Sequence, residues 1–580
     1  MSRSRTFLAF ALGAPLLSVS SASAQSAPGA ASSCTAFLRL PDGAPAGVYA
    51  DYARTAELAG AAPLRPWVIR RPAEQRRLPG CEDERAGPWR TRLPADSASA
   101  PGELRVELVP PKWRVHINSA YPTDRNDGAL WPGRGVATSL RGGVIGSWDF
   151  GWGTISATLA PAVLFHENRD FEIRTVKAAQ LSPFAYPWHH GRIDWPQRFG
   201  ESAFWVLDPG QSQLRINVRG WTLGLSNENL WWGPALRYPL LMSNTAPGFP
   251  HVFTGTSRPL ATPIGRIEGR LQWGWLRESD YFDVRPENDR RMFAGIVMDY
   301  EPRWLPGLFL GFARAYLVRI PEDGLEWSDY FTRPYANVRS NPLGNSNPLN
   351  DNQIISLFAR WAFPEVGFEA YAEWAREDHW EDLDDLLMEP DHAQAYMLGF
   401  QKVVPGDARW IRLYGELAHL QSSTTFRSRR PPVTFYTHTP LVQGYTHRGQ
   451  LLGAAIGPGS DAQLIGVDVF GEWGLVGLHL ERVRRDNDAY YETWARYYGY
   501  RGHDVELTAG VRHHFFDGDF DIGWGLTYST RKNRNFIGLD GFSQALRVET
   551  NWALDLEVAW SPGVRRTRRP ATLSTRADER

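Results

Sequence analysis

The chain has 580 residues and a formal net charge of -1 at pH 7, so its overall charge does not favour nucleic acid or anionic lipid as a partner. Hydrophobic residues make up 43% and charged residues 22% of the chain, as in a soluble protein, but its 25 tryptophans are unusual. Because tryptophan favours sites that are partly apolar and partly wet, the composition leaves two classes open: a membrane protein with aromatic belts, and a large soluble β-protein with aromatic cores.

Residues 1–24 have the pattern of a secretory signal peptide. Two arginines precede an apolar run from Phe7 to Val19, and Ala22 and Ala24 occupy the small-residue positions of a cleavage site. The run is too short to cross a bilayer as a helix, so we expect cleavage after Ala24 and export of the mature chain. No later stretch of about 18 apolar residues predicts a transmembrane helix.

Residues 25–102 are predicted to form a small, partly helical N-terminal segment. The stretch "VYADYARTAELAG", from Val48 to Gly60, has helical spacing. It places Tyr52 and Ala56 on one face and ends on a glycine that stops the helix. Proline, arginine and glycine then interrupt the chain, so this segment has a limited core.

The only two cysteines of the chain, Cys34 and Cys81, lie in this N-terminal segment. Since an exported protein meets an oxidising compartment, we expect them to form a disulfide that closes the segment. The alternative is a pair of free, buried thiols.

Residues 103–562 change to a period of two, which is clearest in "LRVETNWALDLEVAW". One face of this run carries Leu546, Val548, Thr550, Trp552, Leu554, Leu556, Val558 and Trp560. The other face carries Arg547, Glu549, Asn551, Asp555 and Glu557. A strand separates these two sets, whereas a helix would scatter the charges around its axis. The run is longer than a usual strand of about five or six residues and long enough for a tilted membrane strand, which needs about nine to eleven.

The same alternation recurs along this region, with apolar residues on one face and charged residues on the other. Further cases begin at Leu214, Ile267, Phe368, Ile411 and Phe520. In lipid every backbone polar group must pair internally, and a closed barrel achieves this because it has no edge. We therefore predict a transmembrane, closed antiparallel β-barrel of about 16 to 20 strands, with an apolar outside and a polar inside. A soluble sandwich is the alternative fold, but its strands would be shorter.

A barrel of this width is too large for its wall side chains alone to fill, so it is either a channel or plugged. The residues after the last predicted strand, 563–580, are basic and do not alternate. We interpret them as a disordered tail.

The segment from Gly191 to Asp283 resembles the signature region of the capsule assembly protein Wzi family. The likeness rests on "RIDWPQRFG", "LDPGQS", "LSNENLWWGPALR", "PLLMSN", "APGFPH", "PIGRIEG" and "ESDYFD", which occur in order. The resemblance implies a monomeric outer-membrane barrel of 18 strands with a periplasmic helical portion and a plugged interior. It also implies a lectin-like function, in which the protein binds and retains capsular or other surface polysaccharide at the outer face.

Within this signature region, eight residues stand out, and we interpret them as structural. They are Asn229, Trp231, Trp232, Gly233, Pro234, Asn244, Pro247 and Pro250. Trp231 to Pro234 are expected to form a strand end and a sharp turn at a membrane interface. Met242 to Pro250 are expected to fold inward against the wall, with the two asparagines satisfying backbone groups. Direct sugar contact is the alternative role.

Two other loops are candidates for polysaccharide contact. The first, from Asp486 to Asp504, mixes aromatic rings with charged groups, which suits the faces and hydroxyls of sugars. Its candidate residues are Tyr490, Tyr491, Trp494, Arg496, Tyr498 and Arg501. The second loop runs from Phe426 to Gln450. Its residues Arg427 and Arg429 could pair with the acidic groups of an anionic polysaccharide. The alternatives are a loop that packs on itself and a solvated loop, respectively.

The sequence contains no His-Glu-x-x-His pair and no nucleophile elbow, so we predict no enzyme, no metal and no cofactor. The expected partners are surface polysaccharide and outer-membrane lipid, and nucleic acid is not expected. A porin or transporter for saccharides with the same fold is the alternative function, and an outer-membrane hydrolase is a weaker one.

Overall fold

The structure is a computed structural model, and it describes the following residues of the chain. They are 37–38, 47–69, 76–77, 87–89, 102, 104–123, 127–176, 181–189, 191–282, 289–331, 351–377, 387–388, 391, 393–422, 434–439, 441–495, 502–537 and 547–560. The signal peptide, the Cys34–Cys81 pair and the basic tail lie outside the described residues and stay predictions.

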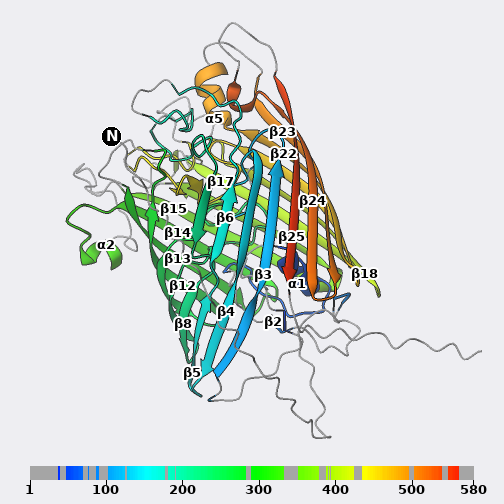
Figure 1. Cartoon of the computed structure of the whole chain (residues 1–580). Helices are drawn as coiled ribbons and strands as arrows, with labels where there is room; N and C mark the ends of the chain where they lie inside the picture. Colours follow the sequence, from blue (N-terminus) through cyan, green and yellow to red (C-terminus); the bar gives the residue numbers. More distant parts are fainter. Residues whose placement is uncertain are drawn as a thin grey trace, which may run out of the picture.

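The long strands close into one antiparallel barrel (Figure 1). They are β3 (Leu104–Asn118), β4 (Gly135–Asp149), β5 (Gly153–Leu159), β6 (Ala162–His166), β7 (Phe204–Asp208), β8 (Gln213–Val218), β9 (Trp221–Ser226), β10 (His251–Thr256), β11 (Leu260–Thr262), β12 (Gly265–Arg277), β13 (Arg290–Pro302), β14 (Leu308–Arg319), β15 (Asn352–Phe363), β16 (Phe368–Glu377), β17 (Gln394–Pro405), β18 (Arg409–His419), β21 (Asp461–Gly471), β22 (Gly474–Arg485), β23 (Asp504–Asp517), β24 (Phe520–Lys532) and β25 (Val548–Trp560).

Three strands of the barrel are interrupted, and each consists of two short strands in line. β5 and β6 both pair with β4, and on their other side they pair with β8 and β7, respectively. β10 and β11 both pair with β12. The short strands β5 and β6, β7 and β8, and β10 and β11 therefore each count as one barrel strand. The described residues form eighteen barrel strands, and β25 closes the ring on β3. The predicted closed barrel of about 18 strands is confirmed.

The alternation of apolar and polar residues along each strand corresponds to the outer and inner faces of the barrel wall. On β25, Trp552 and Leu556 are exposed on the outside, while Glu549 on the inside accepts a hydrogen bond from Arg534 Nε at 2.7 Å. Successive strand residues point to opposite faces, so one apolar set covers the outer surface and the charges gather within. No helix in the described part of the chain is long and apolar enough to cross a membrane.

The two ends of the barrel differ in the length of their connections. One end, which we call the short-turn end, joins the strands through 150–152, 219–220, 263–264, 303–307, 364–367, 406–408, 472–473 and 518–519. The other, the long-loop end, joins them through 119–134, 167–203, 227–250, 278–289, 320–351, 378–393, 420–460, 486–503 and 533–547. The smaller elements of these loops are α2 (Trp327–Phe331), β19 (Thr446–His447), β20 (Gln450–Leu451), α5 (Asn487–Ala489) and a π-turn over Tyr490–Ala495.

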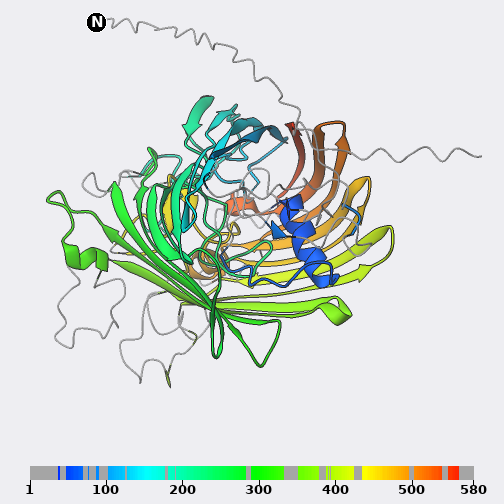
Figure 2. The same ribbon diagram turned by 90° about the horizontal axis from the view of Figure 1, so that it is seen from below.

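The N-terminal helix α1 (Val48–Leu58) lies at the short-turn end, inside the ring of strands (Figure 2). Tyr52 and Ala56 are buried as its spacing predicted, and Gly60 follows the helix with a left-handed φ of 72°. Tyr52 stacks on Trp89 and Trp410, with ring centroids 4.3 and 5.5 Å apart. The helix is therefore packed against the wall through an aromatic cluster. The chain also forms the two-residue strands β1 (Phe37–Leu38) and β2 (Arg76–Arg77), which pair with each other.

Two segments from the long-loop end fold back into the barrel, and we call them the inner segments. They are residues 227–250 and 441–460. Trp232, Leu240 and Leu452 belong to them and are buried in the largest apolar cluster of the protein, together with wall residues such as Phe293 and Met397. The interior therefore has its own apolar core, formed jointly by the inner segments and apolar residues of the wall.

Candidate functional site

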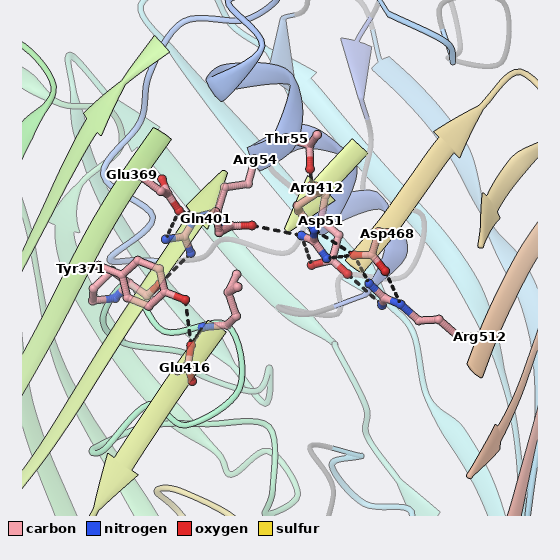
Figure 3. A network of polar contacts seen from close by, with 12 residues as sticks. Asp51, Arg54, Thr55, Glu369, Tyr371, Gln401, Arg412, Glu416, Asp468 and Arg512 are labelled. Atoms are coloured by element: carbon pink, nitrogen blue, oxygen red, sulfur yellow. Dashed lines mark hydrogen bonds and ion pairs between the residues drawn. The ribbon is translucent and has the colours of Figure 1, made fainter. Parts of the chain in front are cut away.

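The helix α1 is tied to the wall by a network of charged side chains (Figure 3). Asp51 accepts hydrogen bonds from Arg412 Nη1 at 3.0 Å and from Arg512 Nη1 at 2.9 Å. Both arginines also bind Asp468, with Arg512 Nη2 at 2.8 Å. Burial alone would raise the pKa of Asp51, but the two guanidinium groups outweigh it and hold the pKa at about 2. Asp51 therefore stays ionised as the link between helix and barrel.

A second buried network lies one turn further along α1. Arg54 Nε donates to Glu369 Oε1 at 2.7 Å, and Arg360 Nη2 lies 2.6 Å from Glu369 Oε2. Arg54 Nη1 also donates to the carbonyl oxygen of Pro234 at 2.6 Å. The helix thus contacts the wall and an inner segment through the same side chain.

The signature residues around Pro234 lie inside the barrel, not at a membrane interface as the sequence suggested. Trp231 and Trp232 are each 1% exposed. The backbone N–H of Gly233 donates to the carbonyl oxygen of Val68 at 3.0 Å, which joins the motif to the N-terminal segment. A pair of adjacent tryptophans gives no signal that separates an interfacial site from a lumen core, because both settings favour large aromatic rings.

The first inner segment is held to the wall by carboxylates that receive its backbone N–H groups. Glu416 on β18 accepts from Leu236, Arg237 and Tyr238, at distances from 2.6 to 3.0 Å. Glu373 on β16 accepts from Leu240 at 3.1 Å. A non-regular segment must find partners for its buried N–H groups, and these inward carboxylates supply them.

The second half of the motif folds inward as expected. Asn229 Nδ2 donates to the carbonyl oxygen of Ala246 at 2.7 Å, which is the expected use of that asparagine. Pro247 and Pro250 flank Gly248, where the backbone passes so close to Asn227 that a Cβ would lie 1.9 Å from its carbonyl oxygen. The sequence therefore needs glycine at that position to let two stretches of backbone meet.

A cavity of about 420 Å³ remains inside the barrel between α1, the first inner segment and the wall strands β3, β4, β18 and β21 to β25. Its lining is mostly charged and polar. Arg114, Arg237, His479, Arg512 and Asp555 all contribute to it. Arg114 is itself paired, with Nη1 2.6 Å from Asp127 Oδ1, so the charges of the cavity are largely balanced.

A smaller pocket of about 70 Å³ lies among the loops of the long-loop end. We call it the loop pocket. Its aromatic rings come from Trp131, Phe171, Tyr186 and Trp195, and its polar groups from Gln197, Arg485, Arg531, Arg534 and Asn535. Rings beside planar amide and guanidinium groups can contact both the apolar face and the hydroxyl or carboxylate groups of a sugar.

The arginines of the loop pocket are fixed by carboxylates. Arg531 binds Asp504 in a two-point contact, with Nε at 2.8 Å and Nη2 at 2.7 Å. Arg534 Nε donates to Glu549, and its guanidinium lies 5.5 Å from the centre of the Phe171 ring. These contacts hold the guanidinium planes in place around the pocket.

A family model for "Capsule assembly protein Wzi" matches residues 206–569, which is more than half of the chain. The chain belongs to the capsule assembly protein Wzi family. Among solved structures, it is similar to Wzi of Escherichia coli, described as an outer-membrane protein involved in group 1 capsule assembly and a carbohydrate-binding β-barrel. The two share 11% identity over 78% of this chain and 84% of that chain, with a TM-score of 0.51.

The Pseudomonas aeruginosa proteins OccK2 and OccK7 are more distant matches, with TM-scores of 0.35 and 0.36. They share 10% and 12% identity with this chain, of which 79% and 80% are covered, against 97% and 99% of their own chains. No protein with a curated description matches the sequence. As a Wzi-family barrel with an apolar outer wall, the protein resides in the outer membrane, which confirms that expectation.

The loop residues that the sequence suggested for polysaccharide contact are only partly described. In this Wzi-family chain Tyr490 is buried, with its ring centroid 3.9 Å from that of His503, so it packs within the protein. Tyr491 is 37% exposed. The side chain of Trp494 and all of Arg496, Tyr498, Arg501, Arg427 and Arg429 lie outside the described residues. Their contact with polysaccharide stays a prediction.

Sequence reasoning did not single out the loop pocket, because its residues come from four separate connections and from the ends of β22 and β24. One signal was available. Trp195 and Gln197 lie in "RIDWPQRFG", one of the motifs that carry the family resemblance. Among the described residues, no group of three histidine, cysteine, aspartate or glutamate side chains is placed to hold a metal ion.

Proposed function

We propose that the protein binds capsular or other surface polysaccharide at its long-loop end and takes part in capsule assembly. Membership of the Wzi family supports the process, and the loop pocket supports the chemistry. The pocket is the observation that carries the proposal. It combines partly exposed rings of Trp131, Phe171 and Trp195 with fixed guanidinium and amide groups.

The long-loop end faces the cell exterior in this proposal, and the short-turn end with α1 faces the periplasm. Bacterial outer-membrane barrels have short periplasmic turns and longer external loops, which is the asymmetry seen here. The inner segments act as a plug, since their apolar residues are packed against the wall. The protein works as a monomer, surrounded by outer-membrane lipid, and by binding without turnover.

The proposal is tested by measuring how the purified barrel in detergent binds an array of bacterial polysaccharides. Replacing Trp195 by alanine removes one ring of the pocket, so we expect a loss of about 1 kcal/mol, or roughly five-fold in affinity. Trp205→Ala is the matched control because that tryptophan is 70% exposed on the outer wall at β7. Equal affinities for the two variants and the wild type would place the polysaccharide elsewhere.

The predicted contacts in the loop after β22 are tested separately on cells. Trp494→Ala combined with Tyr498→Ala should reduce retention of polysaccharide at the cell surface if that loop contributes. Unchanged retention in a correctly inserted variant would remove the loop from the binding surface and leave the loop pocket as the site. The saccharide porin alternative expects stepwise currents from the wild-type protein in planar bilayers, whereas the binding proposal expects little or none.

A further inference from the structure

Three cavities inside the barrel form a series in which each cavity shares lining residues with the next. The large cavity of about 420 Å³ meets a small one of about 30 Å³ at Arg237 and His479, which line both. The small cavity meets the loop pocket of about 70 Å³ at Ile456 and Arg485, which again line both. The three spaces therefore follow one another along the inside of the wall.

This series of cavities extends from one end of the barrel to the other. The large cavity begins beside Asp521 and Ala559, next to the short-turn end, and the loop pocket ends beside Arg534 and Asn535 at the long-loop end. Between these two ends, strands β22 to β24 form a part of the barrel wall that lines the cavities. It presents polar groups such as Glu506 to the middle cavity.

The middle cavity is the narrowest part of the series. Its volume of about 30 Å³ is enough for roughly two water molecules, since about 10–15 Å³ of such space holds one. A sugar residue does not fit through it. The cavity forms the constriction between two larger, polar spaces.

Side chains close the constriction on both sides. At the junction with the large cavity, which we call the lower neck, Arg237 Nη2 lies 3.4 Å from Glu481 Oε2, and the hydroxyl of Tyr238 donates to the same carboxylate. At the junction with the loop pocket, which we call the upper neck, Arg485 Nη2 lies 2.8 Å from Glu506 Oε2, opposite Ile456 of the second inner segment. Each neck is thus closed by an arginine paired with a glutamate.

The backbone beside the lower neck is fixed, but the Arg237 side chain is not fully enclosed. Glu416 accepts the N–H groups of residues 236 to 238, which holds the inner segment against β18. The Arg237 side chain is 30% exposed, so it borders open space within the lumen. The part of the plug that can clear the neck is therefore a side chain and not the whole segment.

We propose that the barrel contains a closed polar passage for water and small ions along β22 to β24, with Arg237 and Arg485 as its two gating side chains. The passage excludes saccharides at the constriction. Its closure does not depend on polysaccharide binding, although its upper end opens into the loop pocket and Arg485 lines both. Ion flow through such a series is limited by its narrowest part, so shortening the side chains at the necks must open it.

The experiment measures conductance of the purified full-length barrel in planar lipid bilayers. We expect little or no current from the wild type and stepwise, ohmic currents from the double variant R237A/R485A. The increase should be roughly tenfold or more, because the constriction sets the total resistance. His479→Ala removes a lining side chain of the lower neck from the wall side without touching the inner segment, and combined with R485A it should have the same direction of effect.

The matched control is R314A. Arg314 is a buried, inward arginine on β14 that donates to Gln353 at 2.6 Å and lines none of the three cavities. Folding of each variant is checked by its heat-dependent mobility on detergent gels. Currents in the neck variants but not in R314A support the passage. Folded neck variants that stay closed overturn it, and so do equal currents in R314A, which would mean that any lost arginine loosens the plug.

Discussion

Arg54 on α1 and Glu369 on β16 form a buried ion pair between segments 315 residues apart, with Arg54 Nε 2.7 Å from Glu369 Oε1. The same carboxylate is held by Arg360 at 2.6 Å on its other oxygen. Glu369 is therefore shared by two cations, one on the helix and one on β15. The pair positions α1 so that Arg54 also reaches the carbonyl oxygen of Pro234 in the signature motif.

Replacing Glu369 by alanine is expected to destabilise the protein more than replacing Arg54. The Glu369 variant leaves two buried guanidinium groups without this partner, and breaking a buried pair costs about 3–5 kcal/mol. The Arg54 variant leaves Glu369 still paired with Arg360, so its cost is smaller. The free energy of unfolding in urea, measured in lipid vesicles, gives both values.

Glu301→Ala is the control for this comparison. Its partner Arg266 is 53% exposed, and an exposed pair contributes only about 0–1 kcal/mol. An Arg54 variant as unstable as the Glu369 variant would show that the cost comes from the helix itself and not from the shared carboxylate.

The Asp51 carboxylate predicts an acid-dependent attachment of α1. Its folded pKa of about 2 lies below the ordinary 3.8, because Arg412 and Arg512 outweigh the effect of burial. A depressed pKa contributes stability that is present above the ordinary value and is lost as the pH falls through the folded pKa. The melting temperature of the wild type should therefore approach that of Asp51→Asn between about pH 4 and pH 2. A difference between the two that stays constant over this range would contradict the assignment.

The strands and the helix could be predicted because their residues repeat with a period that records which face is buried. On β25 the alternation of Trp552 and Leu556 with Glu549 is visible in the sequence alone. The inner segments have no such period. Their positions depend on partners such as Glu416, which lies 180 residues from Leu236, so local sequence could not show that Trp232 lies in the lumen.

The loop pocket was not predictable for a related reason. Trp131, Phe171 and Trp195 gather there only after the strands between them have closed the ring. Aromatic loop residues that are close in sequence were easier to notice, but Tyr490 among them is buried against its own loop. Exposure, which decides whether a ring can bind sugar, is set by the tertiary packing.

Gly248 in the signature motif predicts a strong effect of a single methyl group. A Cβ at this position would meet the carbonyl oxygen of Asn227 at 1.9 Å, and both atoms belong to backbone, so neither can turn away. Gly248→Ala should therefore lower the free energy of unfolding by an amount typical of overpacking, about 1–3 kcal/mol. Gly146→Ala on β4 is the control, since nothing lies within 4 Å of its Cβ position. Equal stabilities of the two variants would mean that the motif does not need the close approach.

A contact between two loops at the long-loop end predicts a pH dependence opposite to that of Asp51, with stability lost as the pH rises. His189 Nε2 lies 3.0 Å from Asp486 Oδ1, and the hydroxyl of Tyr186 donates to Asp486 Oδ2 at 2.6 Å. Burial alone would lower the pKa of His189, but the Asp486 carboxylate outweighs it and raises the pKa above the ordinary 6.5. Burial also raises the pKa of the nearby Glu492 to about 7. For both groups, the folded state holds the proton more tightly than the unfolded chain does.

A raised pKa contributes stability that is fully present below the ordinary value and is lost as the pH rises through the folded value. Residues 182–189 and 191–200 should therefore exchange their amide hydrogens faster at pH 9 than at pH 6, after correction for intrinsic rates. His189→Gln should reduce this change, because glutamine gains no charge beside Asp486, while the part due to Glu492 should remain. His513→Gln on β23 should leave it intact, since that histidine contacts Trp473 and Trp524 on the wall. If exchange in the wild type does not depend on pH, the ion pair does not fasten these two loops, and the rings of the loop pocket are held by packing alone.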